Sequence, residues 1–165
     1  MAFDAFLKVE GVPGESKDEK HSDWIEILQF SNGHDQPASG TASSVGSLTA
    51  ERANFRQFVV TKAIDKASPK LAQACASGEH YPTVTLELCR AGGDKQPYME
   101  YKLTDAIVSS FASGGANISE EAVPTETVQF SYGKIEWKYT QTQVAGGKGS
   151  GTVAAGWDLK TNKKV

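Results

Sequence analysis

A glycine-rich segment at residues 146–151 is the first place to look for chemistry, because glycine-rich loops can bind phosphate through their backbone. A phosphate-binding P-loop would also need glycine at position 142 and serine or threonine at position 149. The sequence has Thr142 and Gly149 instead. We therefore expect a loop between two strands here and no nucleotide site.

The three histidines and two cysteines are the next residue types that could bind a metal or act in catalysis. We find no helical metal-ligand pattern around His21, His34 or His80, and we expect each to be a surface or turn residue. Cys75 and Cys89 form no CxxC motif and have no adjacent histidine. We therefore expect buried free thiols, and no disulfide, metal site or cofactor.

Two further catalytic patterns are absent from the sequence or poorly supported by it. No Gly-x-Ser-x-Gly motif is present, which is the strand-to-helix turn that carries the serine of α/β-hydrolases. Acidic pairs occur at Asp18 and Glu19 and at Glu120 and Glu121, but both lie in polar, turn-rich segments. We expect solvated surface there, and we predict that the protein is not an enzyme.

Length and composition indicate one soluble globular domain of 165 residues, of which 39% are hydrophobic and 22% charged. The net charge of -3 argues against binding driven by nucleic-acid phosphates. Apolar runs are far shorter than the ~20 residues that a membrane-spanning helix needs. The N-terminus has neither the basic nor the apolar segment of a signal peptide, so we expect a cytoplasmic protein unless a specialised route exports it.

Alternation of apolar and polar residues dominates the chain and predicts half-buried strands. It is clear from Phe3 to Val9, and again at residues 83–89 and 98–103, which the turn at 91–94 joins into a hairpin. The same pattern predicts further strands at 23–31, 55–61, 106–112, 125–132, 134–140 and 152–159.

One segment has helical signals. Ser68 is placed to cap a helix that begins with Pro69, Leu71 and Ala74 fall on one face, and Gly78 can end the helix in a left-handed conformation. We predict one short helix at about residues 69–77. Together these patterns predict a mostly β fold, either a compact β-barrel or a two-sheet β-sandwich.

Two features suggest that a partner covers part of this fold. The strand at residues 24–30 has apolar residues on both faces, and an isolated domain would leave one face in water. It is followed by a long extended loop at about residues 32–53 with little apolar content. A neighbouring subunit would explain both features.

The tryptophans leave one alternative open. Trp24, Trp137 and Trp157 could form a sugar-stacking surface like those of carbohydrate-binding modules. Each lies in an alternating strand, however, where packing in the core or against a subunit is the more common role. A monomeric sugar-binding protein is therefore the weaker hypothesis.

Several motifs resemble those of one family. They are Gly-Glu-Ser-Lys-Asp at 14–18 followed by His21, then residues 61–71, 75–82, 89–93, 107–110, 127–135 and 156–159. In order and spacing these segments closely resemble the haemolysin-coregulated protein family, Hcp, of bacterial type VI secretion systems. The resemblance covers essentially the whole chain, although residues 36–53 match no fixed motif.

The resemblance implies a function and a set of partners. Family membership would make residues 1–165 a single tube domain without a C-terminal toxin extension. Six copies would form a ring, and stacked rings would form the inner tube of a phage-tail-like injection machine with sheath, spike and baseplate components. Contraction of the sheath would export the cytoplasmic tube without a signal peptide, and small effector proteins would bind within the ring.

The resemblance also suggests where these contacts lie. Ser31, at the end of the two-faced strand, would face the lumen and bind effectors. Gly92 and Gly93 at the hairpin turn, and Lys160 near the C-terminus, would lie on opposite faces of the ring and meet between stacked rings.

Overall fold

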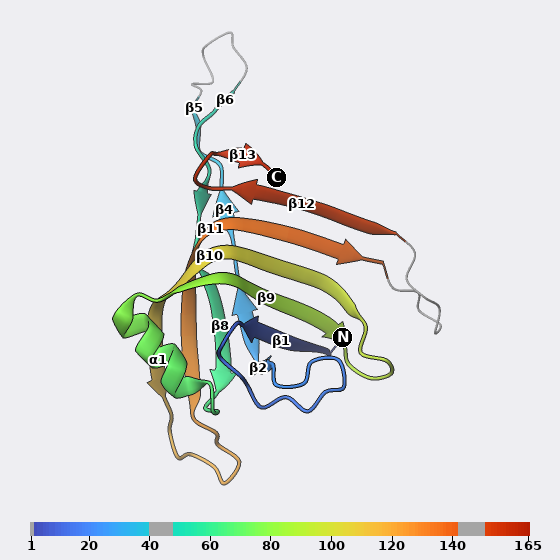
Figure 1. Ribbon diagram of the computed structural model, residues 1–165, viewed down its shortest axis with the longest axis vertical. Helices are drawn as coiled ribbons and strands as arrows, with labels where there is room; N and C mark the ends of the chain where they lie inside the picture. The colour runs from blue at the N-terminus through green and yellow to red at the C-terminus, as the bar shows by residue number, and fades with distance from the viewer. Residues whose placement is uncertain (1, 40–47, 142–150) are drawn as a thin grey trace.

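The computed structural model describes residues 2–39, 48–141 and 151–165, and this part of the chain is mostly β-strand with one helix (Figure 1). Of the glycine-rich segment at 146–151, only Gly151 is among these residues. The first strands are β1 (Phe3–Val9), β2 (Ile25–Ile27), β3 (Gln29–Ser31), β4 (His34–Asp35), β5 (Ala38–Ser39), β6 (Thr49–Ala50), β7 (Asn54–Phe55) and β8 (Phe58–Ala63). After helix α1 (Ser68–Ser77) come β9 (His80–Arg90), β10 (Pro97–Gly114), β11 (Thr125–Thr140), β12 (Thr152–Asp158) and β13 (Lys163–Lys164).

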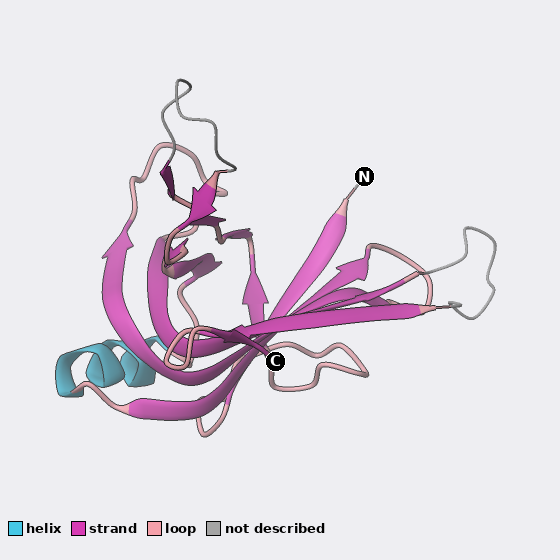
Figure 2. Cartoon of the chain, turned by 90° about the horizontal axis from the view of Figure 1, so that it is seen from above, coloured by secondary structure: helices cyan, strands magenta, loops and turns pink. Residues whose placement is uncertain are grey.

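The two long strands β10 and β11 belong to both layers of the fold. The main sheet has the order β13-β12-β11-β10-β9-β1-β2, and it fans out from the helix end in Figure 1. The first part of β11, Thr125 to Phe130, pairs with β10 on one side and, in place of β12, with β8 on the other. β8 pairs in turn with β3. The hydrophobic core contains residues of both layers, such as Leu86 of β9 and Val60 of β8. Figure 2 shows how strongly the long strands curve between the layers.

A corner in the long strands separates the layers. In the β10–β11 register, Asp105 and Gly133 are skipped between the pairs Thr104–Lys134 and Ala106–Tyr132. Asp105 has a φ of 53°, a left-handed conformation that is uncommon for residues other than glycine. The register shifts a little further along, between Val108 and Ser110. The unpaired residues and this bulge let both strands bend, so the same two strands can turn from one layer into the other.

The fold is sandwich-like and not a closed barrel, which decides between the two predicted architectures. The strand at residues 25–31 changes partner half-way: β2 pairs with β1, and β3 pairs with β8. Leu28 lies between them and donates its backbone N–H to the carbonyl of Thr61 at 2.8 Å. The chain therefore crosses from the main sheet to the β3–β8 layer at a single residue, Leu28.

The predicted strand pattern is confirmed, but several predicted strands are longer in the structure. The segments at 98–103 and 106–112 are one strand, β10, and those at 125–132 and 134–140 are one strand, β11. The hairpin between β9 and β10 turns at residues 91–94 as predicted. The sequence predicted two strands in each case because the alternation of apolar and polar side chains is interrupted at the corner, near Asp105 in β10 and Gly133 in β11.

Helix α1 matches the predicted segment, while its cap differs. The N-cap is Ala67, with no side-chain cap hydrogen bond, so the predicted capping role of Ser68 is wrong. The Ser68 hydroxyl instead lies in the core and donates to Glu126 at 2.7 Å. Gly78 ends the helix with a φ of 68°, as predicted. No helix in the described ranges is long and apolar enough to span a membrane.

The segment predicted as a long extended loop at 32–53 is a two-stranded arm in its described part. His34 and Asp35 of β4 pair with β7, and Ala38 and Ser39 of β5 pair with β6. The arm extends from the top of the molecule in Figure 1. The sequence predicted an extended loop because the mostly polar composition shows no alternation of apolar and polar residues that would indicate these short strands.

A buried ion pair joins β8 to β11. Lys62 shares the inward side of β8 with Phe58 and Val60, and its side chain is fully buried. Its Nζ lies 2.7 Å from Oε2 of Glu126 and 2.8 Å from Oδ1 of Asp65. The ammonium also donates to the carbonyl of Ala63 and the hydroxyl of Ser68. This network ties the start of the helix to the sheet.

Substituting Lys62 by methionine should leave the Glu126 carboxylate buried without its partner and lower the free energy of unfolding by about 3–5 kcal/mol. Urea denaturation followed by circular dichroism measures this change. Lys66→Met is the matched control, because the exposed pair of Lys66 with Asp23 contributes at most about 1 kcal/mol. Equal stability losses in the two variants would contradict this account, whereas adding Glu126→Leu to Lys62→Met should recover much of the loss.

Candidate functional site

Ser31 lies at the end of β3 and is exposed, pointing away from the core. Its register neighbours are Val59 on β8 and, beyond it, Gln129 on β11. The outward residues of this layer are uncharged, and we call them the uncharged face: Gln29, Ser31, Val59, Thr61, Thr127 and Gln129. Such a surface offers hydrogen-bond donors and acceptors without a net electrostatic field.

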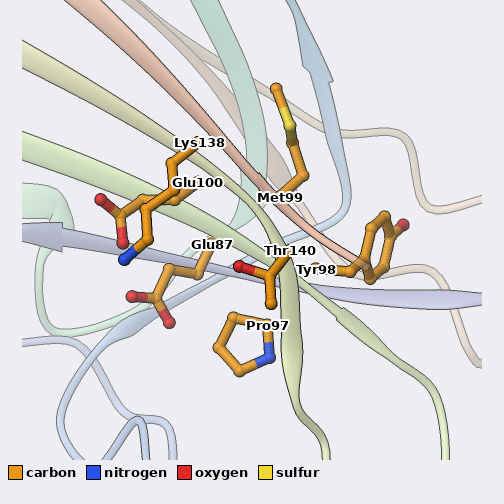
Figure 3. A pocket seen from close by; sticks show the side chains of 7 residues that line it. All are labelled: Glu87, Pro97, Tyr98, Met99, Glu100, Lys138 and Thr140. Atoms are coloured by element: carbon orange, nitrogen blue, oxygen red, sulfur yellow. The ribbon is translucent and has the colours of Figure 1, made fainter. Parts of the chain in front are cut away.

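The other layer has outward side chains of a different kind. We call these the charged face: Lys8, Glu87, Glu100, Lys102, Glu136 and Lys138. Opposite charges face each other across β10 and β11, where Lys102 pairs with Glu136 and Glu100 with Lys138. Figure 3 shows Glu87, Glu100 and Lys138 on one side of the sheet, around a shallow pocket, with Met99 directed to the other side.

The residues predicted to meet between rings lie at separate places in the fold. Gly92 and Gly93 form the β9–β10 turn with φ values of 91° and 67°, a conformation that glycine adopts without strain. Lys160 lies in the turn between β12 and β13, where its ammonium forms an ion pair with Asp105 at the corner. Asp105 also lies 3.0 Å from Nδ1 of His80. The structure therefore separates the glycine turn from Lys160.

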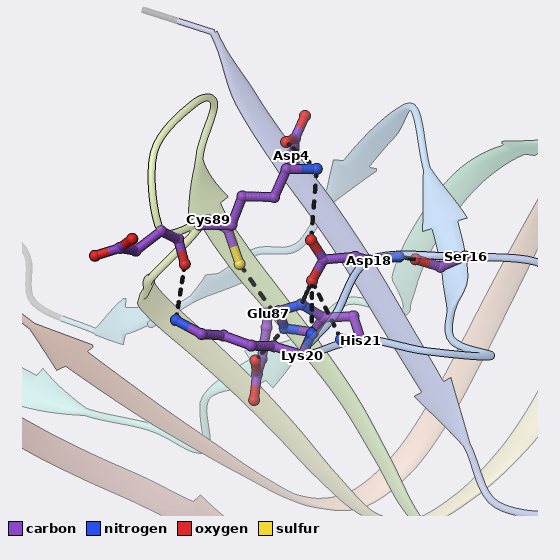
Figure 4. Close-up of polar contacts among 9 residues, drawn as sticks. Asp4, Ser16, Asp18, Lys20, His21, Glu87 and Cys89 are labelled. Atoms are coloured by element: carbon purple, nitrogen blue, oxygen red, sulfur yellow. Dashed lines mark hydrogen bonds and ion pairs between the residues drawn. The ribbon is translucent and has the colours of Figure 1, made fainter.

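His21 lies in the turn-rich connection between β1 and β2, but it is buried and not at the surface. Its side chain is 1% exposed, and its ring nitrogens lie 2.7 Å from Asp18 and 2.7 Å from Glu87 (Figure 4). The imidazole stacks on Phe6 with ring centroids 4.4 Å apart. The Asp18 side chain is only 11% exposed, so it is not the solvated residue that was predicted. Its hydrogen bond with His21 holds the pKa of Asp18 below its usual value.

The other polar predictions match the structure. His34 and His80 are exposed, as are Glu19, Glu120 and Glu121. Both cysteines are free thiols: Cys89 is buried and Cys75 is half-buried. Burial and the nearby carboxylates of Glu87, Asp18 and Asp4 raise the pKa of Cys89 to about 12, which makes its thiol a poor nucleophile.

The tryptophans pack against the fold. Trp137 and Trp157 are half-buried against the core. Trp24 makes a T-shaped contact with the His21 ring, with ring centroids 4.9 Å apart. This packing is the role that the alternating pattern favoured over a sugar-stacking surface.

Comparison with known proteins gives consistent matches. The family model described as "Type VI secretion system effector, Hcp" matches residues 6–139. "Protein hcp1" of Pseudomonas aeruginosa is 36% identical over 163 residues, which cover 98% of each chain. "Major exported protein" of the same species is 30% identical over 143 residues, covering 83% of this chain and 79% of the relative. A solved structure described as a type six secretion system protein has 39% identity and a TM-score of 0.92, covering 99% of this chain and 100% of that one.

The chain belongs to the Hcp family of the type VI secretion system. The resemblance read from the sequence motifs is thereby confirmed across nearly the whole chain. Hcp proteins are secreted tube proteins, so this chain is a structural protein and not an enzyme. The surfaces of this Hcp protein, rather than a catalytic pocket, are therefore its candidate functional sites.

Sequence reasoning missed the buried polar residues of this Hcp protein. Glu126 lies on the inward side of the strand predicted at 125–132, so alternation with Val128 was a usable signal for its burial. Lys62 lies one residue beyond the strand predicted at 55–61, and only the longer observed strand β8 continues the alternation of Phe58 and Val60 to it. No comparable signal marks His21, which lies in the connection between β1 and β2. The contact of His21 with Glu87 depends on how that connection crosses β9.

Proposed function

We propose that this Hcp chain is the tube subunit of a type VI secretion system. Six copies form a ring, the rings stack into the inner tube, and contraction of the surrounding sheath exports the tube. The ring also holds small effector proteins in its lumen. Family membership supports the general role, and the two open edges of the main sheet support the assembly.

The open edges carry the proposal of a ring. At one edge, β13 pairs only with Trp157 and Asp158 of β12. Among the described residues, no strand covers the outer edge of β12 from Thr152 to Ala155, so a strand of another subunit could pair there. Val153 on this edge is 71% exposed. Monomeric proteins usually protect such edges with charges, prolines or bulges, and this one is uncharged.

The opposite edge has matching properties. β2 pairs only with Ala5, Phe6 and Leu7 of β1, so the start of β1 at Phe3 lies beyond the β2 pairing. Phe3 is 42% exposed and the bridging Leu28 is 60% exposed. Joining the β12 edge of one copy to the β1–β2 edge of the next is a head-to-tail contact, and such contacts form a ring when the rotation closes.

The uncharged face around Ser31 is the surface that we assign to the lumen. A tube has to retain its cargo and then release it, and hydrogen bonds to serine, threonine and glutamine are weak enough individually to allow both. The charged face on the other layer then points outward, toward the sheath. Spike and baseplate components contact the ends of the tube.

Stacking of rings is assigned to the two turns described above. The turn with Gly92 and Gly93 presents backbone groups without side chains, and Lys160 presents an ammonium that is 64% exposed at its own turn. A cation against exposed backbone carbonyls would form a favourable polar contact between rings.

The ring is tested by the mass of the purified protein in solution. Six copies of the 17.7 kDa chain predict about 106 kDa by light scattering, with an open centre in negative-stain images. Val153→Asp places a charge on the open β12 edge and should reduce the mass to that of the monomer while circular dichroism stays unchanged. Ile118→Asp is the control, because this side chain is 87% exposed in the connection between β10 and β11. A wild-type monomer would refute the ring, and an intact Val153→Asp ring would refute this interface.

The lumen assignment is tested by replacing Ser31 with tyrosine. We expect an intact ring with at least about tenfold weaker retention of a co-expressed small effector, equivalent to ~1.4 kcal/mol, because the bulky side chain blocks the neighbouring hydrogen-bonding groups. Co-purification followed by quantitative mass spectrometry measures the retained effector. Thr85→Tyr, the same change on the charged side of the main sheet, should leave retention unchanged. Equal retention by wild type and Ser31→Tyr would refute the assignment.

Cysteine cross-linking tests the stacking contacts. Cysteines at Gly93 and Lys160 should join rings under oxidation and yield covalent dimers on non-reducing gels, which either single variant should not. Because Gly93 has a left-handed backbone, Asp94→Cys paired with Lys160→Cys provides a second pair without that strain. Absence of inter-ring dimers from both pairs, in samples where electron microscopy shows stacked rings, would refute the placement.

A further inference from the structure

Three metal-ligating side chains meet beneath the β1–β2 connection. Glu87 and Cys89 lie two residues apart on β9 and therefore project from the same side of the strand. The connection between β1 and β2 places His21 over them, as Figure 4 shows. His21 is 1% exposed, Cys89 is fully buried, and the Glu87 side chain is 18% exposed. Their three ligand atoms all lie within 4.8 Å of one another.

The distances are close to those of a tetrahedral metal centre. With Zn–N near 2.05 Å and Zn–S near 2.3 Å, a nitrogen and a sulfur on one zinc ion are about 3.6 Å apart. Nε2 of His21 lies 3.8 Å from Sγ of Cys89. Nε2 also lies 2.7 Å from Oε2 of Glu87, whereas ligands on one zinc would need about 3.3 Å. A small rotation of the flexible, partly exposed Glu87 side chain supplies this difference.

Asp18 provides the outer contact that metal-binding histidines usually have. Its Oδ2 lies 2.7 Å from Nδ1 of His21. When Nδ1–H donates to a carboxylate, Nε2 carries the lone pair that can bind a metal, and the ring orientation is fixed. The stacking of His21 on Phe6 restricts the ring further. The imidazole is therefore held with Nε2 directed toward Glu87 and Cys89.

The charges around the cluster also fit a divalent cation. The Glu87 carboxylate and the Cys89 thiolate would together balance a charge of +2. Two protons would be released to solvent on binding, the thiol proton of Cys89 and the proton shared between Nε2 of His21 and Glu87. The nearby cations have other partners: Lys95 lies 3.3 Å from Asp4 and 3.5 Å from Asp18. Lys20 donates to the backbone carbonyl of Asp94 at 2.7 Å.

We infer that His21, Glu87 and Cys89 form a zinc-binding site that ties the β1–β2 connection to β9, with Asp18 orienting His21 and water in the fourth position. Nitrogen and sulfur ligands favour zinc over magnesium or calcium, which prefer oxygen. This role is independent of the tube function. The metal would brace the segment beside the proposed β1–β2 edge without taking part in chemistry.

Cobalt(II) is the probe for this site, because it takes the place of zinc and reports its ligands by absorption. The untagged protein is refolded with Co²⁺, since the ligands are buried in the folded chain. We expect one Co²⁺ per chain, with a thiolate-to-cobalt charge-transfer band that added Zn²⁺ abolishes. The band should persist in Cys75→Ser and disappear in Cys89→Ser, with Zn²⁺ affinity at least about tenfold lower in Cys89→Ser.

A second variant keeps the test decisive if Cys89→Ser does not refold. Glu87→Gln retains the size of the side chain and should weaken Zn²⁺ binding about tenfold or more while keeping the thiolate band. The inference is overturned if the wild type shows no thiolate band, or if wild type and Cys89→Ser bind Co²⁺ equally. Equal binding would place the metal on exposed groups such as His34 or His80.

Discussion

The corner at Asp105 and Gly133 is the constraint on which the rest of this fold depends. It allows β10 and β11 to serve in both layers, so that the two sheets share strands as well as a core. The left-handed backbone of Asp105 costs free energy. Its carboxylate pairs with Lys160 and also contacts His80, and the hydrogen bond from Lys160 holds the pKa of Asp105 below its usual value. At Gly133 an added Cβ would lie 2.7 Å from Cε of Lys160, so a larger residue there would displace the end of the flexible lysine side chain.

The shared strands determine the chemistry of the two outer surfaces. Before the corner, outward positions of β10 carry Glu100 and Lys102, which pair with opposite charges on β11. On the other side of the corner, outward positions of β11 carry Thr127 and Gln129. One pair of strands thus presents a charged surface on one layer and an uncharged surface on the other. In the ring proposed above, this difference would separate a wall that faces cargo from a wall that faces the sheath.

Each layer also contains one buried polar cluster. Lys62 and Glu126 join β8 to β11 in the layer of the uncharged face, and His21 joins Asp18 to Glu87 beneath the β1–β2 connection. Buried polar groups are costly when unpaired, so a wrong strand register or a displaced connection would be penalised strongly. Both clusters therefore favour one arrangement of the layers and of the edges at which subunits would meet.

The amino-acid sequence alone was sufficient to predict the mostly β fold, the β9–β10 hairpin, the helix that ends at Gly78, and membership of the Hcp family. These properties follow from alternation, turn residues and short motifs, all of which depend on near neighbours in the chain. The burial of His21, the ion pair of Lys62 with Glu126 and the pairing of β4 with β7 and of β5 with β6 became evident only in the tertiary structure. Glu126 lies 64 residues from Lys62, and Glu87 lies 66 residues from His21. Such contacts depend on strand register and on the corner in β10 and β11, and no local pattern of residues specifies either.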